Sequence, residues 1–195
     1  MKIGVLAIQG DFDAHRVTLE KLGAEVILVR NPGQLEGLGG LIIPGGESTT
    51  FLELLKPGDF FNKLRDFVRI KPTFGTCAGT ILLAKDVENP SQKTLGALNI
   101  RVQRNAYGRQ QESFIRTCDT AFGPLEMVFI RAPRIAGVGD GVEVLARDGD
   151  DPILVRQLNI LASTFHPELS ESTTIHNEFL KMAAASEEQA PLEKT

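Results

Sequence analysis

A short apolar strand runs directly into a helical stretch at Thr73-Phe74-Gly75-Thr76-Cys77-Ala78-Gly79. A G-x-C-x-G sequence at such a junction is typical of the sharp strand-to-helix turn that projects a nucleophile from the top of an α/β sheet. Small residues flank the nucleophile because the backbone turns tightly and packs closely there. The helix N-terminus that follows favours the thiolate form of Cys77 over the thiol. The alternative interpretation is a buried cysteine without chemistry, which is the more common role of a lone cysteine.

Strands and helices alternate on both sides of this junction in the first half of the chain. Short runs rich in Val and Ile are separated by amphipathic stretches, and turn residues such as Asn31-Pro32-Gly33 end the runs. Such alternation predicts a parallel sheet with helices on both faces. The expected strands are 2–9, 25–30, 40–43 and 73–76, and the expected helices are 11–22, 48–55, 59–69 and 78–84.

The second half has a different pattern, with short strands separated by turns and few helical signals. We therefore predict an antiparallel extension at one edge of the parallel sheet, followed by a last strand and a C-terminal helix. The expected strands are 100–103, 113–117, 126–130, 142–147, 153–158 and 160–164, and the expected helix is 171–185. These elements predict a three-layer α/β fold, a mostly parallel sheet flanked by helices, as a single domain of residues 1–185 with a polar tail at 186–195.

Charge and hydropathy exclude two classes of partner. The 195 residues carry 21 Lys and Arg against 25 Asp and Glu, a net charge of −4, without a basic block. Such a chain is a poor match for a phosphate backbone, so nucleic acid is not expected as a partner. No apolar run approaches the roughly 18 residues that a membrane span requires, so no membrane association is expected.

The cysteine and histidine content bears on location and on metal binding. Two cysteines cannot form a disulfide framework for a domain of this size, which favours a cytoplasmic protein with reduced thiols. The three histidines and two cysteines are scattered and lack the spacing of metal ligands, so no metal and no cofactor are predicted.

A thiolate nucleophile requires a base, and the three histidines are the candidates. His15 lies in the first predicted helix, where a polar-face or capping role is the default, and His176 lies in the last helix, where exposure is the default. His166 instead follows the last predicted strand, and the carboxyl ends of strands are where catalytic groups gather in open α/β sheets. Glu168 could orient the imidazole. We predict a Cys77–His166–Glu168 triad, although the His-Pro-Glu sequence alone could be only a turn.

A glycine-rich loop follows the third predicted strand at Pro44-Gly45-Gly46-Glu47-Ser48-Thr49-Thr50. The N–H groups of Gly46 and Ala78 could hold the oxyanion of a tetrahedral intermediate. Ser48 and Thr49 could cap the next helix, and a tight loop with a helix cap explains the residues almost as well. The loop is not a P-loop because the lysine after the glycines is missing.

These motifs resemble those of a known family. The junction around Cys77, the loop 44–48 and Phe165-His166-Pro167-Glu168 together resemble the class I (triad) glutamine amidotransferases. Within that class, three further segments resemble the glutaminase subunits of pyridoxal 5′-phosphate synthase, from Met1 to about Ala185. Thr80, where an apolar residue is more usual, and Tyr107, where Phe is common, are small departures. The three segments are Leu6-Ala7-Ile8-Gln9-Gly10 with His15, Arg104-Asn105-Ala106-Tyr107-Gly108-Arg109-Gln110, and Phe129-Ile130-Arg131-Ala132-Pro133.

The resemblance implies a flavodoxin-like fold and the hydrolysis of L-glutamine to glutamate and ammonia. Cys77 would attack the side-chain amide, His166 would protonate the leaving ammonia and activate water, and Glu168 would orient the ring. Arg104 also makes physical sense, because its planar fork fits the substrate α-carboxylate. By position in the family's motifs, the residues that contact glutamine would be Gly46, Glu47, Ser48, Arg104, Ile130 and Arg131.

The resemblance further implies a partner that uses the ammonia. This partner would be a separate TIM-barrel synthase subunit in a hetero-oligomer, and docking would activate the glutaminase. We hypothesise that docking flips the Gly45–Gly46 peptide to complete the oxyanion hole. Two alternatives stay open: a glutaminase subunit of another synthase, such as imidazole glycerol phosphate synthase, and a non-catalytic protein on the same fold with Cys77 as a redox sensor.

Overall fold

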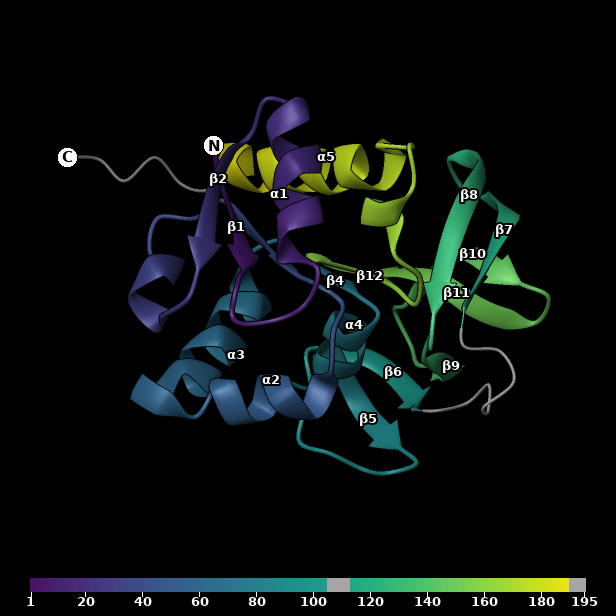
Figure 1. The fold of residues 1–195 in the computed structure, drawn as a ribbon, viewed down its shortest axis with the longest axis horizontal. Helices are drawn as coiled ribbons and strands as arrows, with labels where there is room; N and C mark the ends of the chain where they lie inside the picture. The colour runs from purple at the N-terminus through teal and green to yellow at the C-terminus, as the bar shows by residue number, and fades with distance from the viewer. Residues whose placement is uncertain (105–112, 190–195) are drawn as a thin grey trace.

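A mixed sheet of nine strands runs through the molecule (Figure 1). The structure is a computed structural model that describes residues 1–104 and 113–189. Five strands pair in parallel: β1 (Lys2–Leu6), β2 (Glu25–Val29), β3 (Gly40–Ile43), β4 (Thr73–Thr76) and β12 (Ile160–Ser163). Antiparallel pairing then adds β11 (Asp151–Gln157), β10 (Glu143–Asp148), β7 (Ser113–Thr120) and β8 (Gly123–Ile130). The strand order is β2-β1-β3-β4-β12-β11-β10-β7-β8.

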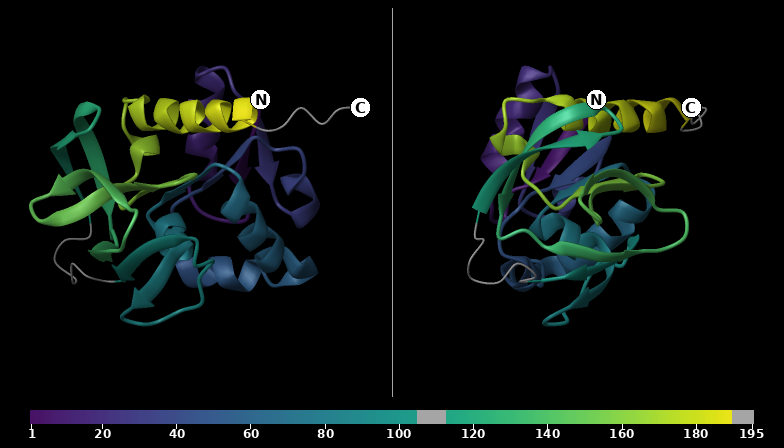
Figure 2. Two further views of the ribbon diagram at one scale, coloured as in Figure 1. Left: turned by 180° about the vertical axis from the view of Figure 1, so that it is seen from behind. Right: turned by 90° about the vertical axis from the view of Figure 1, so that its right-hand side faces the viewer.

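Helices cover both faces of the parallel part, as the continuous apolar runs require. Every residue of β3, β4 and β12 is buried. One face carries α1 (Phe12–Lys21) and α5 (Thr174–Gln189), and the other carries α2 (Ser48–Leu54), α3 (Phe60–Ile70) and α4 (Ala78–Leu83), as Figures 1 and 2 show. Two apolar cores result, with Phe51 and Leu64 in one and Phe74 and Phe179 in the other. Short 3-10 helices complete the set: η1 (Pro32–Leu35), η2 (Pro57–Asp59) and η3 (Pro167–Leu169).

A separate sheet of three strands lies beside α4 (Figure 1). It contains β5 (Ala84–Glu88), β6 (Leu98–Gln103) and β9 (Arg134–Val138). The sequence patterns predict only the middle strand, and they place it wrongly in the antiparallel extension of the main sheet. Strand β5 was missed because it begins at Ala84, the last residue of the predicted helix 78–84, with no turn residue between them. It also exposes Lys85 and Asp86 in succession, so it lacks the alternation of buried and exposed residues that indicates a strand.

The predicted α/β fold is confirmed, with the antiparallel extension on one edge of the parallel strands. The C-terminal helix begins at Thr174 rather than 171 and continues to Gln189, so residues 186–189 of the predicted tail are helical; residues 190–195 lie outside the described part. Among the described residues, no helix combines the length and the apolar character needed to cross a membrane.

The strand order places four loops at one edge of the sheet. Strands β2 and β3 flank β1 on opposite sides, so the chain reverses its direction of winding at β1, and ligands of open α/β sheets bind outside the carboxyl ends at such a point. The loops that follow β1 and β3 meet there, where the Asp11 N–H donates to the Gly45 carbonyl at 3.3 Å. The residues after β4 and β12, which begin with Cys77 and Thr164, leave the same edge.

Candidate active site

Cys77 occupies the tight turn between β4 and α4 that the sequence predicts. Its backbone has φ +46° and ψ −102°, a conformation that L-residues rarely adopt and that the surrounding structure must hold in place. A Cβ on Gly79 would lie 2.0 Å from the Ile43 carbonyl oxygen, and one on Gly75 would lie 2.6 Å from Leu83 Cδ1. The expected need for small flanking residues is therefore confirmed.

Two hydrogen bonds hold the base of this turn against the neighbouring strand. The Cys77 N–H donates to the Ser163 carbonyl at 2.9 Å. The buried Thr80 hydroxyl lies 2.6 Å from the same carbonyl oxygen and 3.0 Å from that of Gly75. Thr80 thus gives the turn a polar link between β4 and β12 that the usual apolar residue cannot provide.

His166 and Glu168 meet Cys77 from the other side. His166 Nδ1 lies 2.7 Å from Glu168 Oε1, and the ring is a hydrogen-bond partner of the Cys77 sulfur, which leaves Nε2 for the sulfur. His166 and Glu168 are both buried. Burial acts to lower the pKa of His166, but the hydrogen bonds and negative charges of Cys77 and Glu168 outweigh it and raise the pKa to about 10. The structure thus brings the three predicted triad residues together, with the imidazole between the sulfur and the carboxylate.

The loop after β3 lies against the His166 ring. A Cβ on Gly45 would lie 2.3 Å from His166 Cε1, so only glycine fits there. Gly46 has φ +150°, and a Cβ on it would lie 2.5 Å from Gln9 Oε1. The Gln9 side chain binds both sides of the next residue: Nε2 donates to the Glu47 carbonyl at 3.0 Å, and the Glu47 N–H donates to Oε1 at 3.2 Å.

A cavity of about 200 Å³ opens in front of Cys77 and His166. The predicted residues Gly46, Glu47, Ser48, Arg104, Ile130 and Arg131 all line it. Two predicted residues stand behind the lining: Ala78 is buried at the start of α4, and Glu168 is buried behind the ring. Of the predicted motif 104–110, residues 105–110 lie outside the described part of the chain.

Glu47, rather than Ser48 or Thr49, caps α2. Its carboxylate accepts hydrogen bonds from the Thr50 N–H at 2.8 Å and from the Thr49 hydroxyl. Burial acts to raise the pKa of Glu47, but these hydrogen bonds outweigh it and lower the pKa to about 2. The other carboxylate oxygen lies 3.2 Å from Arg104 Nη2. The predicted hydroxyl cap is wrong because the longer side chain reaches the free N–H groups from one position earlier.

His15 and His176 are fully buried, which corrects the expected exposed or capping roles. His15 Nδ1 lies 2.9 Å from His176 Nε2, and His15 Nε2 lies 3.3 Å from Glu168 Oε2. Helical periodicity did not identify them because the two histidines contact each other between α1 and α5, near the carboxyl end of β4, where His15 Nε2 lies 3.3 Å from the Thr76 hydroxyl.

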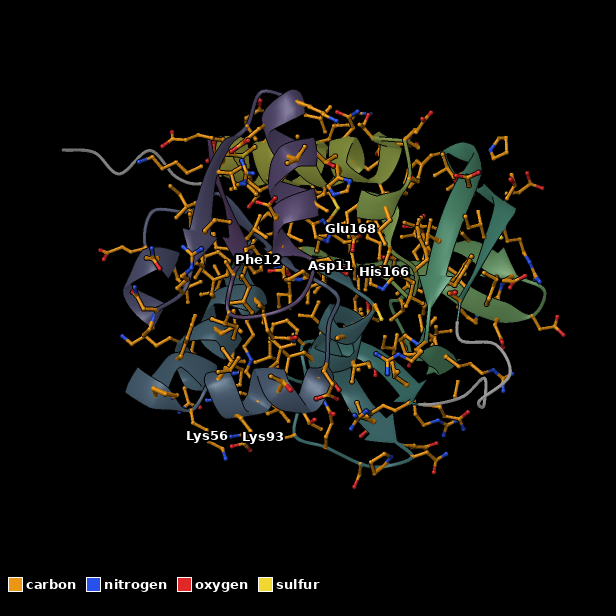
Figure 3. All side chains as sticks on the ribbon, viewed as in Figure 1. Asp11, Phe12, Lys56, Lys93, His166 and Glu168 are labelled. Carbon is orange, nitrogen blue, oxygen red and sulfur yellow. The ribbon has the colours of Figure 1, made fainter. Side chains whose placement is uncertain are left out.

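Asp11 is a further cavity residue that sequence reasoning missed. Its Oδ2 lies 3.7 Å from His166 Nδ1, and Figure 3 shows Asp11, His166 and Glu168 converging where the loops after β1 and β12 meet. The signal was available, because Asp11 follows the carboxyl end of β1. Ligand atoms of the three residues lie within 4.8 Å of one another, but His166 Nδ1 is already committed to Glu168, so the arrangement suits proton transfer better than metal binding.

Iodoacetamide is expected to alkylate Cys77 at neutral pH and to leave Cys118 unmodified. With a pKa of about 10, His166 keeps its proton and its positive charge beside the sulfur, and loses them only as the pH rises through that value. The alkylation rate of Cys77 should therefore change little between about pH 6.5 and about pH 9. Burial and the charge of Asp148 raise the pKa of Cys118. Peptide mass spectrometry across the pH range checks this; a Cys77 rate that rises about tenfold per pH unit, as for a free thiol, would contradict it.

The comparisons with known proteins agree on one family. Residues 5–185 match the SNO glutamine amidotransferase family. The chain is 64% identical over 185 residues to the pyridoxal 5′-phosphate synthase subunit PdxT of Koribacter versatilis, covering 93% of this chain and 95% of the relative. It is 50% identical over 187 residues to the subunit of the same name in Solibacter usitatus, covering 92% and 97%. A crystal structure of a glutamine amidotransferase superposes with a TM-score of 0.89 at 49% identity, covering 93% and 98%.

Proposed function

The chain belongs to the SNO glutamine amidotransferase family, and we propose that its Cys77, His166 and Glu168 hydrolyse L-glutamine to L-glutamate and ammonia for the synthesis of pyridoxal 5′-phosphate. The single observation that carries the assignment of these residues is their alignment, sulfur to imidazole to carboxylate, at the wall of the cavity. The names of the relatives favour this pathway over imidazole glycerol phosphate synthesis.

The chemistry proceeds in two halves. The Cys77 thiolate attacks the carbonyl carbon of the side-chain amide, and the tetrahedral intermediate collapses as His166 gives its Nε2 proton to the leaving nitrogen, so that ammonia departs and a thioester remains. His166, now neutral, takes a proton from water, whose oxygen attacks the thioester and releases glutamate and the sulfur. Glu168 accepts the Nδ1–H throughout and balances the positive ring.

The N–H groups of Gly46 and Ala78 complete the machinery as the oxyanion hole. Ala78 is the first residue of α4 and Gly46 lines the cavity, so both are close to the tight turn between β4 and α4 that carries the sulfur. Losing one such donor typically costs about 10²–10³ in turnover. We propose no metal and no cofactor for this reaction, since thiolate, imidazole and backbone N–H groups account for each step.

Arg104 binds the α-carboxylate of glutamine in this proposal. Its side chain is 12% exposed, and its Nη1 is buried without a hydrogen-bond partner among the described residues, while Nη2 lies 3.2 Å from Glu47. One arm of the guanidinium is therefore available to donate to a carboxylate oxygen. Glu47, Ser48 and the Ile130–Arg131 backbone line the rest of the cavity and contact the substrate.

Arg104→Lys is expected to raise KM for glutamine by about 10- to 100-fold, because lysine lacks the planar fork and the hydrogen bond to a charged group is lost. The turnover number should change far less, since the contact is the same in the ground state and the transition state. Steady-state glutamate release at varied glutamine concentrations measures both. The matched control is Arg101→Lys, because Arg101 is an exposed arginine on β6, three residues before Arg104. A fall in kcat with KM unchanged contradicts a role in binding.

The ammonia passes to a separate TIM-barrel synthase subunit in a hetero-oligomer, and docking switches the glutaminase on. The Gly45–Gly46 peptide supports this because glycines on both sides allow the backbone angles of either orientation, while its carbonyl is held in the present one by the 3.3 Å hydrogen bond from the Asp11 N–H. Gln9 holds the following residue in place. We further propose that residues 1–185 act as one domain, as the sheet that joins β1 to β12 suggests, and that the protein is cytoplasmic, which its two free cysteines favour.

Glutamate release is expected to rise at least about tenfold when the cognate synthase subunit is added. One oxyanion-hole donor is typically worth about 10²–10³ in turnover, and even a partly formed donor at Gly46 in the isolated chain leaves room for this rise. The assay compares the isolated chain with a mixture at saturating synthase. An imidazole glycerol phosphate synthase partner serves as the control and should not activate. Full activity of the isolated chain would count against activation by docking while leaving the triad intact.

A further inference from the structure

The series of side-chain contacts from Cys77 through His166 does not end at Glu168. Behind it lie two histidines that the reaction above does not use, His15 from α1 and His176 from α5 (the helices are seen in Figure 1). Both are completely buried. His15 Nε2 lies 3.3 Å from Glu168 Oε2, and His15 Nδ1 lies 2.9 Å from His176 Nε2. The chain of contacts therefore runs from Cys77 through His166 and Glu168 to the two rings.

The second oxygen of Glu168 needs a donor that the triad does not supply. Oε1 is taken by His166 Nδ1, whereas Oε2 is buried and has no well-aligned hydrogen bond among the described residues. Its close neighbour is His15 Nε2, which also lies 3.3 Å from the Thr76 hydroxyl. Leaving a buried carboxylate oxygen without a donor is costly, so an N–H of His15 directed at Oε2 would satisfy that oxygen and oppose rotation of Glu168 away from His166.

Hydrogen-bond accounting selects one arrangement of protons on the two rings. Burial lowers the pKa of His15 and lowers that of His176 to about 3, so both rings are neutral and each has one N–H and one lone pair. An ionised carboxylate only accepts, so the 3.3 Å contact with Glu168 Oε2 favours the His15 tautomer with its proton on Nε2, an N–H that the Thr76 hydroxyl, also at 3.3 Å, can accept as well. His15 Nδ1 then accepts from His176 Nε2–H, and the bare nitrogen is His176 Nδ1, which has no partner among the described residues.

We propose that His15 and His176 are positioning residues: His15 donates to Glu168 and fixes the carboxylate against His166, and His176 holds His15 in the tautomer that can donate. The inference rests on the proposed glutaminase function. It extends the triad into a five-residue line in which the last two members never touch substrate. The charged and titratable groups that face His15 are Glu168, His166, Asp11 and His176.

The test measures the pH dependence of Cys77 alkylation by iodoacetamide in the full chain. In His15→Leu, Glu168 is released from His166, the imidazolium loses its support, and the thiolate forms only at higher pH. We expect the alkylation rate at pH 7 to fall about tenfold and its pH midpoint to rise, the lower end of what such outer hydrogen-bond partners contribute. His15→Gln, whose Nε2 can occupy the same place as the ring donor, should restore most of the rate.

Two further variants separate positioning from packing. His176→Leu should move the midpoint in the same direction by a smaller amount, which keeps the test valid if His15→Leu does not fold. Phe179→Leu removes buried volume from α5 without touching Glu168, so it should lower the melting temperature and leave the midpoint unchanged. Folded His15→Leu and His176→Leu with the wild-type midpoint would overturn the inference. Failure of the function itself would show differently, as a wild-type chain that releases no glutamate with the synthase present.

Discussion

Cys77→Ala is expected to abolish glutamate release in the presence of the synthase, by at least about 10⁴-fold, as removal of the nucleophile does in other triad enzymes. Alanine leaves water as the remaining nucleophile, without a covalent intermediate to divide the reaction. The fold should survive, since the substitution removes a single sulfur atom, and that atom lies at the wall of an existing cavity rather than inside the packed core. Glutamine binding should persist, because Arg104 and the loop after β3 are untouched.

The matched control is Cys118→Ala, which removes the other buried thiol, on β7 and away from the cavity. It should retain wild-type glutamate release. A glutamine-mimicking electrophile should add one covalent mass to the wild type and to Cys118→Ala, and none to Cys77→Ala. Wild-type turnover in Cys77→Ala would show that the sulfur is not the nucleophile, whereas a wild-type chain with neither turnover nor a covalent adduct would favour the redox interpretation.

His166→Asn is expected to lower glutamate release by about 10³-fold or more, because asparagine cannot take a proton from one group and return it to another. Its amide nevertheless keeps a donor that can reach toward Glu168, so the loss reports on proton transfer rather than on a collapsed site. Without the positive ring, alkylation of Cys77 should become slow at pH 7 and recover as the pH rises, the opposite of the flat profile expected of the wild type.

The control for this variant is the double substitution with Glu168→Gln. If the two residues act as one unit, the double variant should lose little more activity than His166→Asn alone. Additive losses would mean that Glu168 works independently of the ring, contrary to the 2.7 Å contact between them. Melting temperatures of His166→Asn, Glu168→Gln and the double variant should stay within a few degrees of one another, which a spectroscopic thermal scan measures.

The parallel half of the fold and the triad could be predicted because the signals are local. Buried parallel strands are continuous apolar runs, and the glycines around Cys77 report a backbone conformation that the same few residues determine. His166 could be found because a strand end is visible in the sequence, and the edge of the sheet to which it leads follows from the fold class.

The rest depends on contacts between distant segments. Whether His15 and His176 face solvent or each other is decided by how α1 and α5 pack on the sheet. The residue pattern of either helix alone does not predict this contact. The small sheet was missed for a similar reason, since β5 gains its partner only when residues 98–103 fold back beside it. A usable hint existed for His15: it lies four residues after Asp11, so one helical turn carries it along the same face from the strand end.

Gly45 has a consequence for how the imidazole moves during turnover. A Cβ at this position would lie 2.3 Å from Cε1, so the Gly45 backbone packs directly against one side of the ring. The 2.7 Å contact of Nδ1 with Glu168 holds another side, and the two together argue against a swinging histidine that collects a proton in one rotamer and delivers it in another. We therefore expect proton pick-up from the thiol and delivery to the departing nitrogen to take place from one resting orientation of the imidazole, while the reacting atoms of the substrate move relative to it.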